Sequence, residues 1–259
     1  MSGIPKVSVV MPAYNAEKTI RSAIESVLRQ TFGDLELIVI DDCSRDGTVQ
    51  IAEEYCRCDD RVHIQRNAVN LGVSESRNNG VRAAKSDWIA FLDSDDLWEP
   101  EKIEKQLNVI EENPVCSLCF TGSAFVDESG KKYGFSLSVP ERISYKDLLK
   151  QNLISCSSVL VRKELLLLYP MKNDPLIHED FAVWLQILRD EPFAVGINEP
   201  LLIYRLSGSS KSGNKLRAAK MQWRTYRYIG ICGPKAAVYF IIYAFRSLHK
   251  YFNIKRSAE

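Results

Sequence analysis

Short apolar runs alternate with segments of helical period over the first hundred residues. The runs are rich in Val, Ile and Leu, as expected of strands that are covered on both faces. They span Val7–Met11, Leu35–Ile40, Val62–Gln65 and Trp88–Leu92. Apolar residues recur three or four positions apart in the segments between them, which predicts helices over Glu17–Arg29, Asp46–Tyr55 and Ser74–Ala84. The alternation predicts βαβ crossovers and therefore an α/β fold with a mostly parallel central sheet flanked by helices.

The pattern becomes mixed beyond Val115. Strands are predicted over Val115–Phe125, Ser157–Val161 and Leu201–Tyr204, with a hairpin-like turn at Asp127–Gly130. Helices are predicted over Ser144–Gln151, from His178-Glu179-Asp180 through Leu188, and over Lys215–Tyr228 and Lys235–Phe252. The run Ala236–Phe245 is wholly apolar but has only ten residues, far short of the ~20 that span a bilayer.

Carboxylates follow the fourth predicted strand without a break, in the segment Asp93-Ser94-Asp95-Asp96. Burying several uncompensated carboxylates costs several kcal/mol, so a strand that delivers them together needs positive charge at its end. Side chains alternate along a strand, which sends Asp93 and Asp95 to one side, where both can reach a hard cation such as Mg²⁺ or Mn²⁺. A solvated acidic turn that caps the helix starting near Glu99-Pro100 explains the same residues equally well when they are taken alone.

Other polar residues follow the first two strands at the same predicted edge. Tyr14 and Asn15 come after the first strand, and Asp41-Asp42 after the second. The turn at 70–78 feeds a helix that brings Arg77 toward this edge. A packing role for Tyr14 and a capping role for Asp42 are open alternatives, but ligands of parallel sheets bind beyond the carboxyl ends of the strands. Polar residues follow several strands at the same predicted edge of the sheet, and this favours a binding site there.

The charge balance changes along the chain. From Pro200 onward there are twelve Lys or Arg and one acidic residue, Glu259, so this part carries +11 and Met1–Glu199 carries −10. The tail is also aromatic and aliphatic, which favours contact with an anionic membrane over nucleic acid. Packing of the tail on the protein's own core or on another subunit is the alternative. Residues 205–214 either fold over an anionic ligand or form a linker.

Seven scattered Cys and a start that leads directly into a strand indicate a reduced, cytoplasmic protein without a signal peptide. Buried structural cysteines explain Cys116 and Cys119 better than zinc does.

Several motifs occur in the order and spacing typical of one enzyme family. They span about Lys6–Leu206 and read Val-Ser-Val-Val-Met-Pro12-Ala-Tyr14-Asn15, Ser26-Val-Leu-Arg-Gln-Thr31-Phe32, Ile40-Asp41-Asp42-Cys-Ser44-Arg-Asp46-Gly47-Thr48, Asn70-Leu-Gly72, Arg77-Asn78-Asn-Gly80, Phe91-Leu-Asp93-Ser-Asp95-Asp96 and His178-Glu179-Asp180. Together they resemble an inverting family 2 glycosyltransferase with the GT-A fold.

The resemblance implies a nucleotide-diphosphate sugar donor, most often a UDP-sugar, and Mn²⁺ or Mg²⁺. It implies metal binding by Asp95 with Asp93, and a catalytic base at Asp180, although capping explains carboxylates in a first helical turn as well. The implied nucleotide-binding residues are Pro12, Ala13, Tyr14, Glu17, Asp42, Arg77, Asp93 and Ser94. The implied organisation is a GT-A domain at 1–210, with a nucleotide-sugar half at 1–98 and an acceptor half at 99–210, followed by a basic helical tail at 211–259.

Departures from related enzymes narrow the expected activity. The Q-x-x-R-W motif of processive polysaccharide synthases is missing, because Gln222-Trp223-Arg224 has the wrong spacing. The expected reaction adds one sugar to a lipid-linked glycan of bacterial O-antigen or capsule synthesis, at the inner face of the cell membrane. No glycine-rich loop of a nucleotidyltransferase or of a dinucleotide-binding oxidoreductase follows the first strand. A non-catalytic, membrane-associated nucleotide-sugar-binding module is the alternative.

Overall fold

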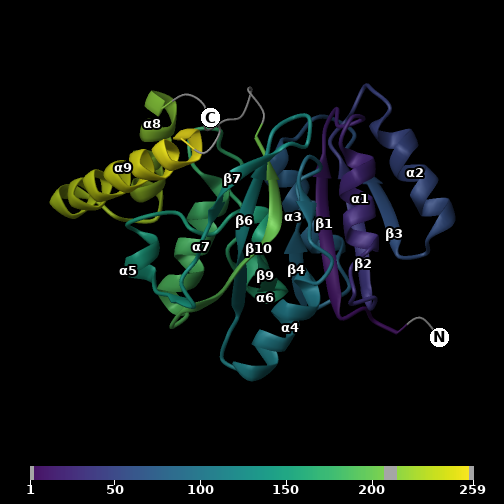
Figure 1. Ribbon diagram of the computed structural model, residues 1–259, viewed down its shortest axis with the longest axis horizontal. Coiled ribbons are helices and arrows are strands. Elements are labelled where there is room, and N and C mark those ends of the chain that lie inside the picture. The colour runs from purple at the N-terminus through teal and green to yellow at the C-terminus, as the bar shows by residue number, and fades with distance from the viewer. Residues whose placement is uncertain (1–2, 207–214, 257–259) are drawn as a thin grey trace.

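The computed structural model describes residues 3–206 and 215–256. Within them, ten strands form one mixed sheet. Its main path runs β3-β2-β1-β4-β9-β6-β10-β5, with β7 paired to β6 and β8 paired to β10 (Figure 1). The predicted α/β class, with helices flanking a central sheet, is confirmed.

The first half of the chain folds as its hydrophobic pattern predicts. Its strands, all parallel, are β1 (Val7–Ala13), β2 (Leu35–Asp41), β3 (Val62–Arg66) and β4 (Trp88–Phe91). The crossover helices are α1 (Ile20–Leu28), α2 (Thr48–Cys58) and α3 (Val73–Ala83). Every residue of β1 and β2 is buried, because helices cover both faces of these strands.

The second half completes the sheet with strands of both directions. The strands are β5 (Leu97–Trp98), β6 (Leu118–Val126), β7 (Lys132–Leu137), β8 (Arg142–Ile143), β9 (Leu160–Arg162) and β10 (Ala194–Arg205). β9 runs antiparallel to both β4 and β6, whereas β6 and β10 are parallel to each other. The helices here are α4 (Lys102–Glu112), α5 (Tyr145–Leu148), α6 (Lys163–Leu168) and α7 (Glu179–Asp190).

Three predicted strands differ from those in the structure. β6 begins at Leu118 rather than at the predicted Val115, because a turn closed by the Cys116 N–H and the Asn113 carbonyl precedes it. The prediction over Ser157–Val161 begins in a 3₁₀ turn at Cys156–Ser158, and only then does β9 follow. β10 is longer than the predicted Leu201–Tyr204, because Asn198, Glu199 and Pro200 interrupt the apolar run without ending the strand. The pairing with β6 shifts register between Ile197 and Leu202, so an irregularity in the ladder absorbs the polar residues.

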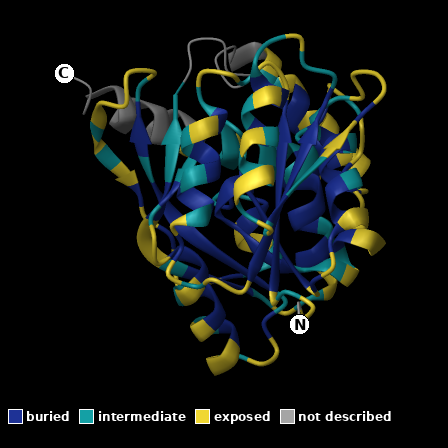
Figure 2. Ribbon diagram, turned by 90° about the vertical axis from the view of Figure 1, so that its right-hand side faces the viewer, coloured by how far each residue is buried: buried dark blue, intermediate teal, exposed yellow. Residues whose placement is uncertain are grey.

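Two cores lie on opposite faces of the sheet, as alternation along β1 requires. Val9 and Met11 pack with α1 and α4, while Val10 packs on the other face with α3 and α7. α3 approaches β1 so closely that a Cβ at Gly80 would lie 2.2 Å from Val10 Cγ1. Figure 2 shows the resulting layers, with buried strands between helices that expose one face.

α8 (Lys215–Tyr228) and α9 (Gly233–Arg256) form a helical pair beyond α7, at the end of the molecule opposite α2 and β3 (Figure 1). The backbone N–H of His178, just before α7, donates to Thr225 Oγ1 on α8 at 2.9 Å. Among the described helices, none is both long enough and apolar enough to cross a bilayer.

Candidate active site

A cavity of about 1000 Å³ opens beyond the carboxyl ends of β1, β2 and β4. The chain passes to opposite sides of β1 in forming β2 and β4, and such a switch point is where α/β sheets bind ligands. Eight of the ten residues predicted for the site line the cavity: Pro12, Ala13, Tyr14, Glu17, Asp42, Asp93, Ser94 and Asp95. The other two, Arg77 and Asp180, are not among the lining residues.

One end of the cavity is formed by the turns after β1 and β2. Tyr14 is 49% exposed and offers a ring face to a ligand. Glu17 Oε2 accepts the backbone N–H of Gly47 at 2.9 Å, which joins the two turns. Asn15 strengthens the same junction, because its backbone N–H donates to Ser44 Oγ and its Oδ1 accepts the N–H of Arg45. This end is therefore held in place before any ligand binds.

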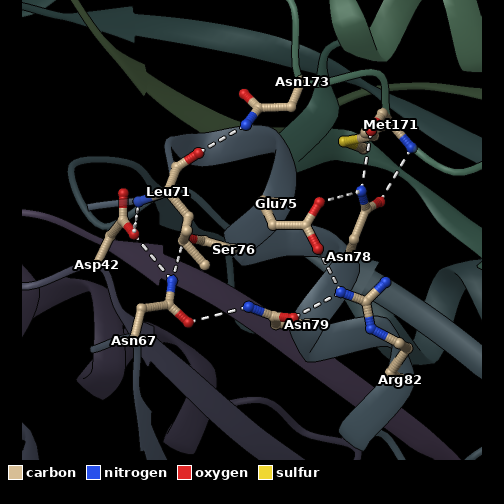
Figure 3. Close-up of polar contacts among 10 residues, drawn as sticks. All are labelled: Asp42, Asn67, Leu71, Glu75, Ser76, Asn78, Asn79, Arg82, Met171 and Asn173. Carbon is tan, nitrogen blue, oxygen red and sulfur yellow. Dashed lines mark hydrogen bonds and ion pairs between the residues drawn. The ribbon is translucent and has the colours of Figure 1, made fainter. Parts of the chain in front are cut away.

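Asp42 is a buried carboxylate whose acceptor capacity is largely used by its own chain. Oδ1 accepts Asn67 Nδ2 and the backbone N–H of Leu71, each at 2.8 Å (Figure 3). Oδ2 accepts the backbone N–H of Gly72, also at 2.8 Å. A carboxylate offers about four acceptor positions, so these bonds leave roughly one for a ligand.

Further amides support this carboxylate from behind. Asn67 Nδ2 also lies 3.0 Å from Ser76 Oγ, and Asn67 Oδ1 accepts Asn79 Nδ2 at 2.9 Å (Figure 3). A second contact holds the loop at 70–72 on the side away from Asp42. Asn173 Nδ2 donates to the carbonyl of Leu71 at 2.9 Å (Figure 3). Gly72 has φ +87°, and a Cβ there would lie 3.3 Å from Asn173 Oδ1, so the loop needs glycine.

The opposite end of the cavity is acidic and short of hydrogen-bond donors. Desolvation, and next the negative charge of Asp93, raise the pKa of Asp95 to about 6, although its side chain reaches the solvent in the cavity. Burial, followed by the charges of Asp93 and Asp95, raises the pKa of Asp96 well above its ordinary value. Asp96 Oδ2 accepts no hydrogen bond from the described residues. Added positive charge at this end would stabilise the ionised carboxylates.

Sequence reasoning missed Ser157 and Glu128 at the acidic end, and it named Arg205 only as part of the predicted loop at 205–214. Ser157 Oγ accepts the backbone N–H of Asp93 at 3.1 Å. Arg205 lies at the end of β10, where its backbone N–H donates to Asp96 Oδ1 at 3.0 Å and its Nε donates to the carbonyl of Asp95 at 2.9 Å. Glu128, from the turn between β6 and β7, also lines the cavity. Arg205 is the first residue of the predicted loop at 205–214, of which residues 207–214 lie outside the described residues.

Asp180 stands in the first turn of α7, next to Glu179. It is partly buried, and its pKa is raised by desolvation and then by the charge of Glu179. A carboxylate with a raised pKa is suited to accept a proton near neutral pH. Arg77 connects this turn to the acidic end, because Nη1 lies 3.3 Å from Glu179 Oε1 and Nη2 lies 2.6 Å from Asp93 Oδ1.

The donor set at the acidic end fits a hard divalent cation that completes its shell elsewhere. Asp93 and Asp95 supply carboxylate oxygens, the ligands that Mg²⁺ and Mn²⁺ prefer. In the described part of the chain, no group of three or more His, Cys, Asp or Glu side chains is arranged to hold an ion. Such a cation would therefore depend on further ligands, as Mg²⁺ bound to a nucleotide diphosphate commonly does.

Relatives of known type match almost the whole chain. A putative teichuronic acid biosynthesis glycosyltransferase, TuaG of Bacillus subtilis, is 38% identical over 95% of this chain and 97% of its own. The Escherichia coli enzyme WfgD, a UDP-Glc:alpha-D-GlcNAc-diphosphoundecaprenol beta-1,3-glucosyltransferase, is 35% identical over 91% of this chain and 90% of its own.

Solved structures share the fold at lower identity. TarS of S. aureus in complex with UDP-GlcNAc superposes with a TM-score of 0.72 at 20% identity, over 86% of this chain. The present chain spans 65% of that TarS chain. A mannosyltransferase from Pyrobaculum calidifontis, in complex with GDP-Man and Mn²⁺, superposes with a TM-score of 0.70 at 15% identity, over 98% of this chain and 73% of its own.

The family model for Glycosyl transferase family 2 matches residues 8–166, from β1 through α6. This range includes the turns after β1 and β2 and the whole acidic end up to Ser157. Together with the near full-length relatives, the match means that the chain belongs to glycosyltransferase family 2 and is a transferase enzyme.

Proposed function

We propose that the protein is an inverting glycosyltransferase that moves one sugar from a nucleotide-diphosphate sugar, with a UDP-sugar favoured, to a hydroxyl of a lipid-linked glycan of bacterial surface polysaccharide synthesis. The observation that carries this proposal is the polarised cavity, with a preorganised aromatic end and an acidic end short of positive charge. We assign the donor to residues 1–98, the acceptor to residues 99–210, and membrane contact to the tail at 211–259.

The preorganised end is assigned to the nucleoside. In this assignment, Tyr14 stacks on the base beside Pro12 and Ala13, and the remaining acceptor position of Asp42 binds a base N–H. Glu17 fixes the turn that carries these groups. A UDP-sugar agrees with the printed activity of WfgD and with the UDP-GlcNAc complex of TarS, whereas the Pyrobaculum enzyme is solved with GDP-Man.

The acidic end is assigned to the diphosphate together with Mn²⁺ or Mg²⁺, held by Asp95 and Asp93. Such an ion, when bound, supplies Lewis-acid stabilisation of the charge that develops on the leaving nucleoside diphosphate. Ser157 orients the backbone at Asp93, and Ser94 lines the cavity between the two carboxylates. Arg205 fixes the loop through the carbonyl of Asp95.

Asp180 is assigned as the general base. The acceptor hydroxyl gives its proton to this carboxylate as its oxygen bonds to the anomeric carbon, and the bond from that carbon to the diphosphate oxygen breaks with its electron pair leaving on the diphosphate. A single in-line displacement inverts the configuration. The raised pKa of Asp180 makes its carboxylate a stronger proton acceptor than an ordinary aspartate.

Nucleotide selectivity is tested by thermal unfolding with UDP, GDP or TDP, each with and without Mn²⁺. A ligand at 100 times its Kd adds about 2.7 kcal/mol, which raises the Tm by roughly 5–10 °C in a chain of this size. We expect this shift with UDP plus Mn²⁺ in the wild type and its loss in Asp95→Asn. Asp34→Asn makes the same change at an exposed site outside the cavity and should keep the shift. No shift with any nucleotide contradicts the proposal.

The catalytic role of Asp180 is tested separately from binding. General-base assistance contributes about 10²–10⁴-fold, so Asp180→Asn should lower the transfer rate at least 100-fold while UDP binding persists. Asp190→Asn, at the exposed end of the same helix, is the matched control and should retain turnover. Unchanged turnover in Asp180→Asn would refute the assignment.

The α8–α9 pair supports contact with an anionic membrane that holds the acceptor. Val238, Ile241 and Phe245 form an outward stripe on α9, and they are 56%, 67% and 74% exposed. The opposite face of this helix packs on the protein through Ala236 and Tyr243. Exposed large apolar side chains in a stripe mark a contact surface.

Basic side chains lie beside the apolar stripe, and they favour a partner with negative charge. The exposed residues Lys235 and Arg246 lie beside it on α9, and the outer face of α8 presents Arg224, Arg227, Lys220, Trp223 and Tyr228. An amphipathic surface with aromatic and basic residues suits the interface of an anionic bilayer, at the inner face of the cell membrane.

Vesicle flotation tests this contact. The wild type should float with phosphatidylglycerol-containing vesicles and much less with neutral phosphatidylcholine, and the triple change Val238→Ser, Ile241→Ser, Phe245→Ser should abolish flotation. The double change Leu167→Ser, Leu168→Ser removes leucines that are 52% and 64% exposed on α6 and should have no effect. Equal flotation of both variants would contradict the assigned surface.

A further inference from the structure

One buried guanidinium connects the carboxylate of Asp93, which the proposed reaction assigns to the donor, with Glu179, the neighbour of the proposed base Asp180. The side chain of Arg77 on α3 is only 5% exposed, and it does not line the cavity. Its Nη2 lies 2.6 Å from Asp93 Oδ1 after β4, and its Nη1 lies 3.3 Å from Glu179 Oε1 in the first turn of α7. The two carboxylates are 86 positions apart in sequence, so Arg77 joins segments that are distant in the chain.

We infer that Arg77 is a positioning residue, whose guanidinium sets the distance between the donor carboxylate Asp93 and the turn of α7 that presents Asp180. The inference rests on the proposed function, in which Asp93 serves the donor and Asp180 the acceptor hydroxyl. Arginine suits the task because its charge is permanent and its planar fork presents several donors in fixed directions. A buried guanidinium with both carboxylates in place is compensated, and it resists any movement that would uncover it.

The same helix guides the chain from α6 into α7. Asn78 donates from Nδ2 to the carbonyl of Met171 at 2.9 Å and accepts the N–H of Met171 with Oδ1 at 3.0 Å (Figure 3). The contact between Asn173 and Leu71 anchors the following residues. These bonds fix the approach to α7, and Arg77 contacts Glu179, the residue before Asp180. α3 thereby links the donor cavity to the catalytic turn.

A mutant cycle tests this coupling in the full chain. Arg77→Lys keeps the charge but cannot bridge both carboxylates, and Glu179→Ala removes the contact at Glu179, whose side chain is 13% exposed and does not line the cavity. We expect each change to lower kcat about 10–100-fold. The double variant should lie within threefold of the worse single variant, because both changes remove the same contact.

The split between rate and affinity separates positioning from donor binding. In Glu179→Ala, the donor KM and the calorimetric Kd for UDP with Mn²⁺ should stay within threefold of the wild type. Arg82→Lys makes the same substitution at an exposed position of α3, where Arg82 pairs with Glu75, and should leave kcat unchanged. If Arg77→Lys does not fold, Glu179→Ala decides by itself.

Several results would overturn the inference. Multiplicative losses in the double variant would mean that Arg77 and Glu179 act independently. A KM that rises as far as kcat falls would make Arg77 a donor-binding residue, and wild-type kcat in Glu179→Ala would leave the contact without a role. If the wild type itself binds no nucleotide and transfers no sugar, the proposed function fails and takes this inference with it.

Discussion

The carboxylates at the two ends of the cavity differ in how many hydrogen-bond donors surround them. Asp42 is surrounded by donors from its own chain, one side-chain amide and two backbone N–H groups. Asp95 and Asp96 have raised pKa values because desolvation and neighbouring negative charge disfavour their ionised forms. Asp42 holds the loop around it through its hydrogen bonds. Asp95 and Asp96, in contrast, are stabilised in their ionised forms when a cation binds near them.

This contrast separates a preorganised subsite from one that a ligand completes. Bonds already formed in the free protein add rigidity and cost nothing at binding. Carboxylates that are short of donors make affinity depend on the cation and on pH. Four measurements test the contrast, and the first addresses the Asp42 end.

Asp42→Asn should produce the largest loss of stability. The amide nitrogen that replaces a carboxylate oxygen faces an N–H donor, and losing bonds to a charged acceptor costs about 1.5–3 kcal/mol each. We expect a Tm lowered by roughly 5–10 °C in calorimetry without ligand. Asp34→Asn should leave the Tm within 1–2 °C, a narrow range expected for an exposed side chain. A Tm loss as small as the control's would mean that Asp42 does not hold its loop.

Acidification should weaken binding at the other end. Asp95 has a pKa of about 6, so below that pH its protonated form competes with the cation, and the apparent Kd for UDP with Mn²⁺ should rise about tenfold per pH unit. The sign for stability is opposite. Because the folded protein holds this proton more tightly than the unfolded chain, the group favours folding as pH falls through 6. Calorimetric titration of the wild type from pH 7.5 to 5 checks the slope of the Kd, and thermal unfolding of ligand-free Asp95→Asn over the same pH range should lack this group's contribution to stability.

Asn79→Ala should weaken the preorganised end more modestly. Asn79 supports Asn67, which in turn donates to Asp42, so its removal costs one neutral hydrogen bond in a partly buried position, together with the exposed bond that Arg82 Nη2 donates to Asn79 Oδ1. The expected loss is about 0.5–1.5 kcal/mol, measured by urea unfolding. Asn113→Ala, a side chain that caps α4 far from the cavity, controls for a generic loss of an amide contact. UDP affinity should fall in Asn79→Ala and stay unchanged in the control.

Asp95→Asn should have the smallest effect on the free protein, and with reversed sign. Removing one charge from the acidic end relieves repulsion with Asp93, so the ligand-free Tm should rise slightly at pH 8, by roughly 1–3 °C, since most such surface changes are worth under 1 kcal/mol. Differential scanning calorimetry without metal or nucleotide measures this shift. A Tm loss comparable to that of Asp42→Asn would erase the distinction between the two ends.

The sequence by itself determined the fold class, the family and the position of the cavity. Hydrophobic period is a local property, so β1, β2 and β4 could be placed from their apolar runs, and the carboxyl ends of parallel strands meet at one edge wherever the helices pack. The order of the motifs along the chain identified the glycosyltransferase family. The assignment of Asp42, Asp93 and Asp95 to one cavity followed from these strand ends.

Only the tertiary structure decided how each group is held. Arg77 contacts Asp93 and Glu179, and Arg205 contacts Asp95. Asn173 donates to Leu71, 102 positions away in the chain. No local sequence pattern encodes such pairings. Lys102 opens α4 and reads as a surface residue, yet it is fully buried against the Trp98 ring, and burial lowers its pKa to about 7. Hydrogen bonds and desolvation depend on which segments meet in space, whereas periodicity depends only on neighbours in the chain.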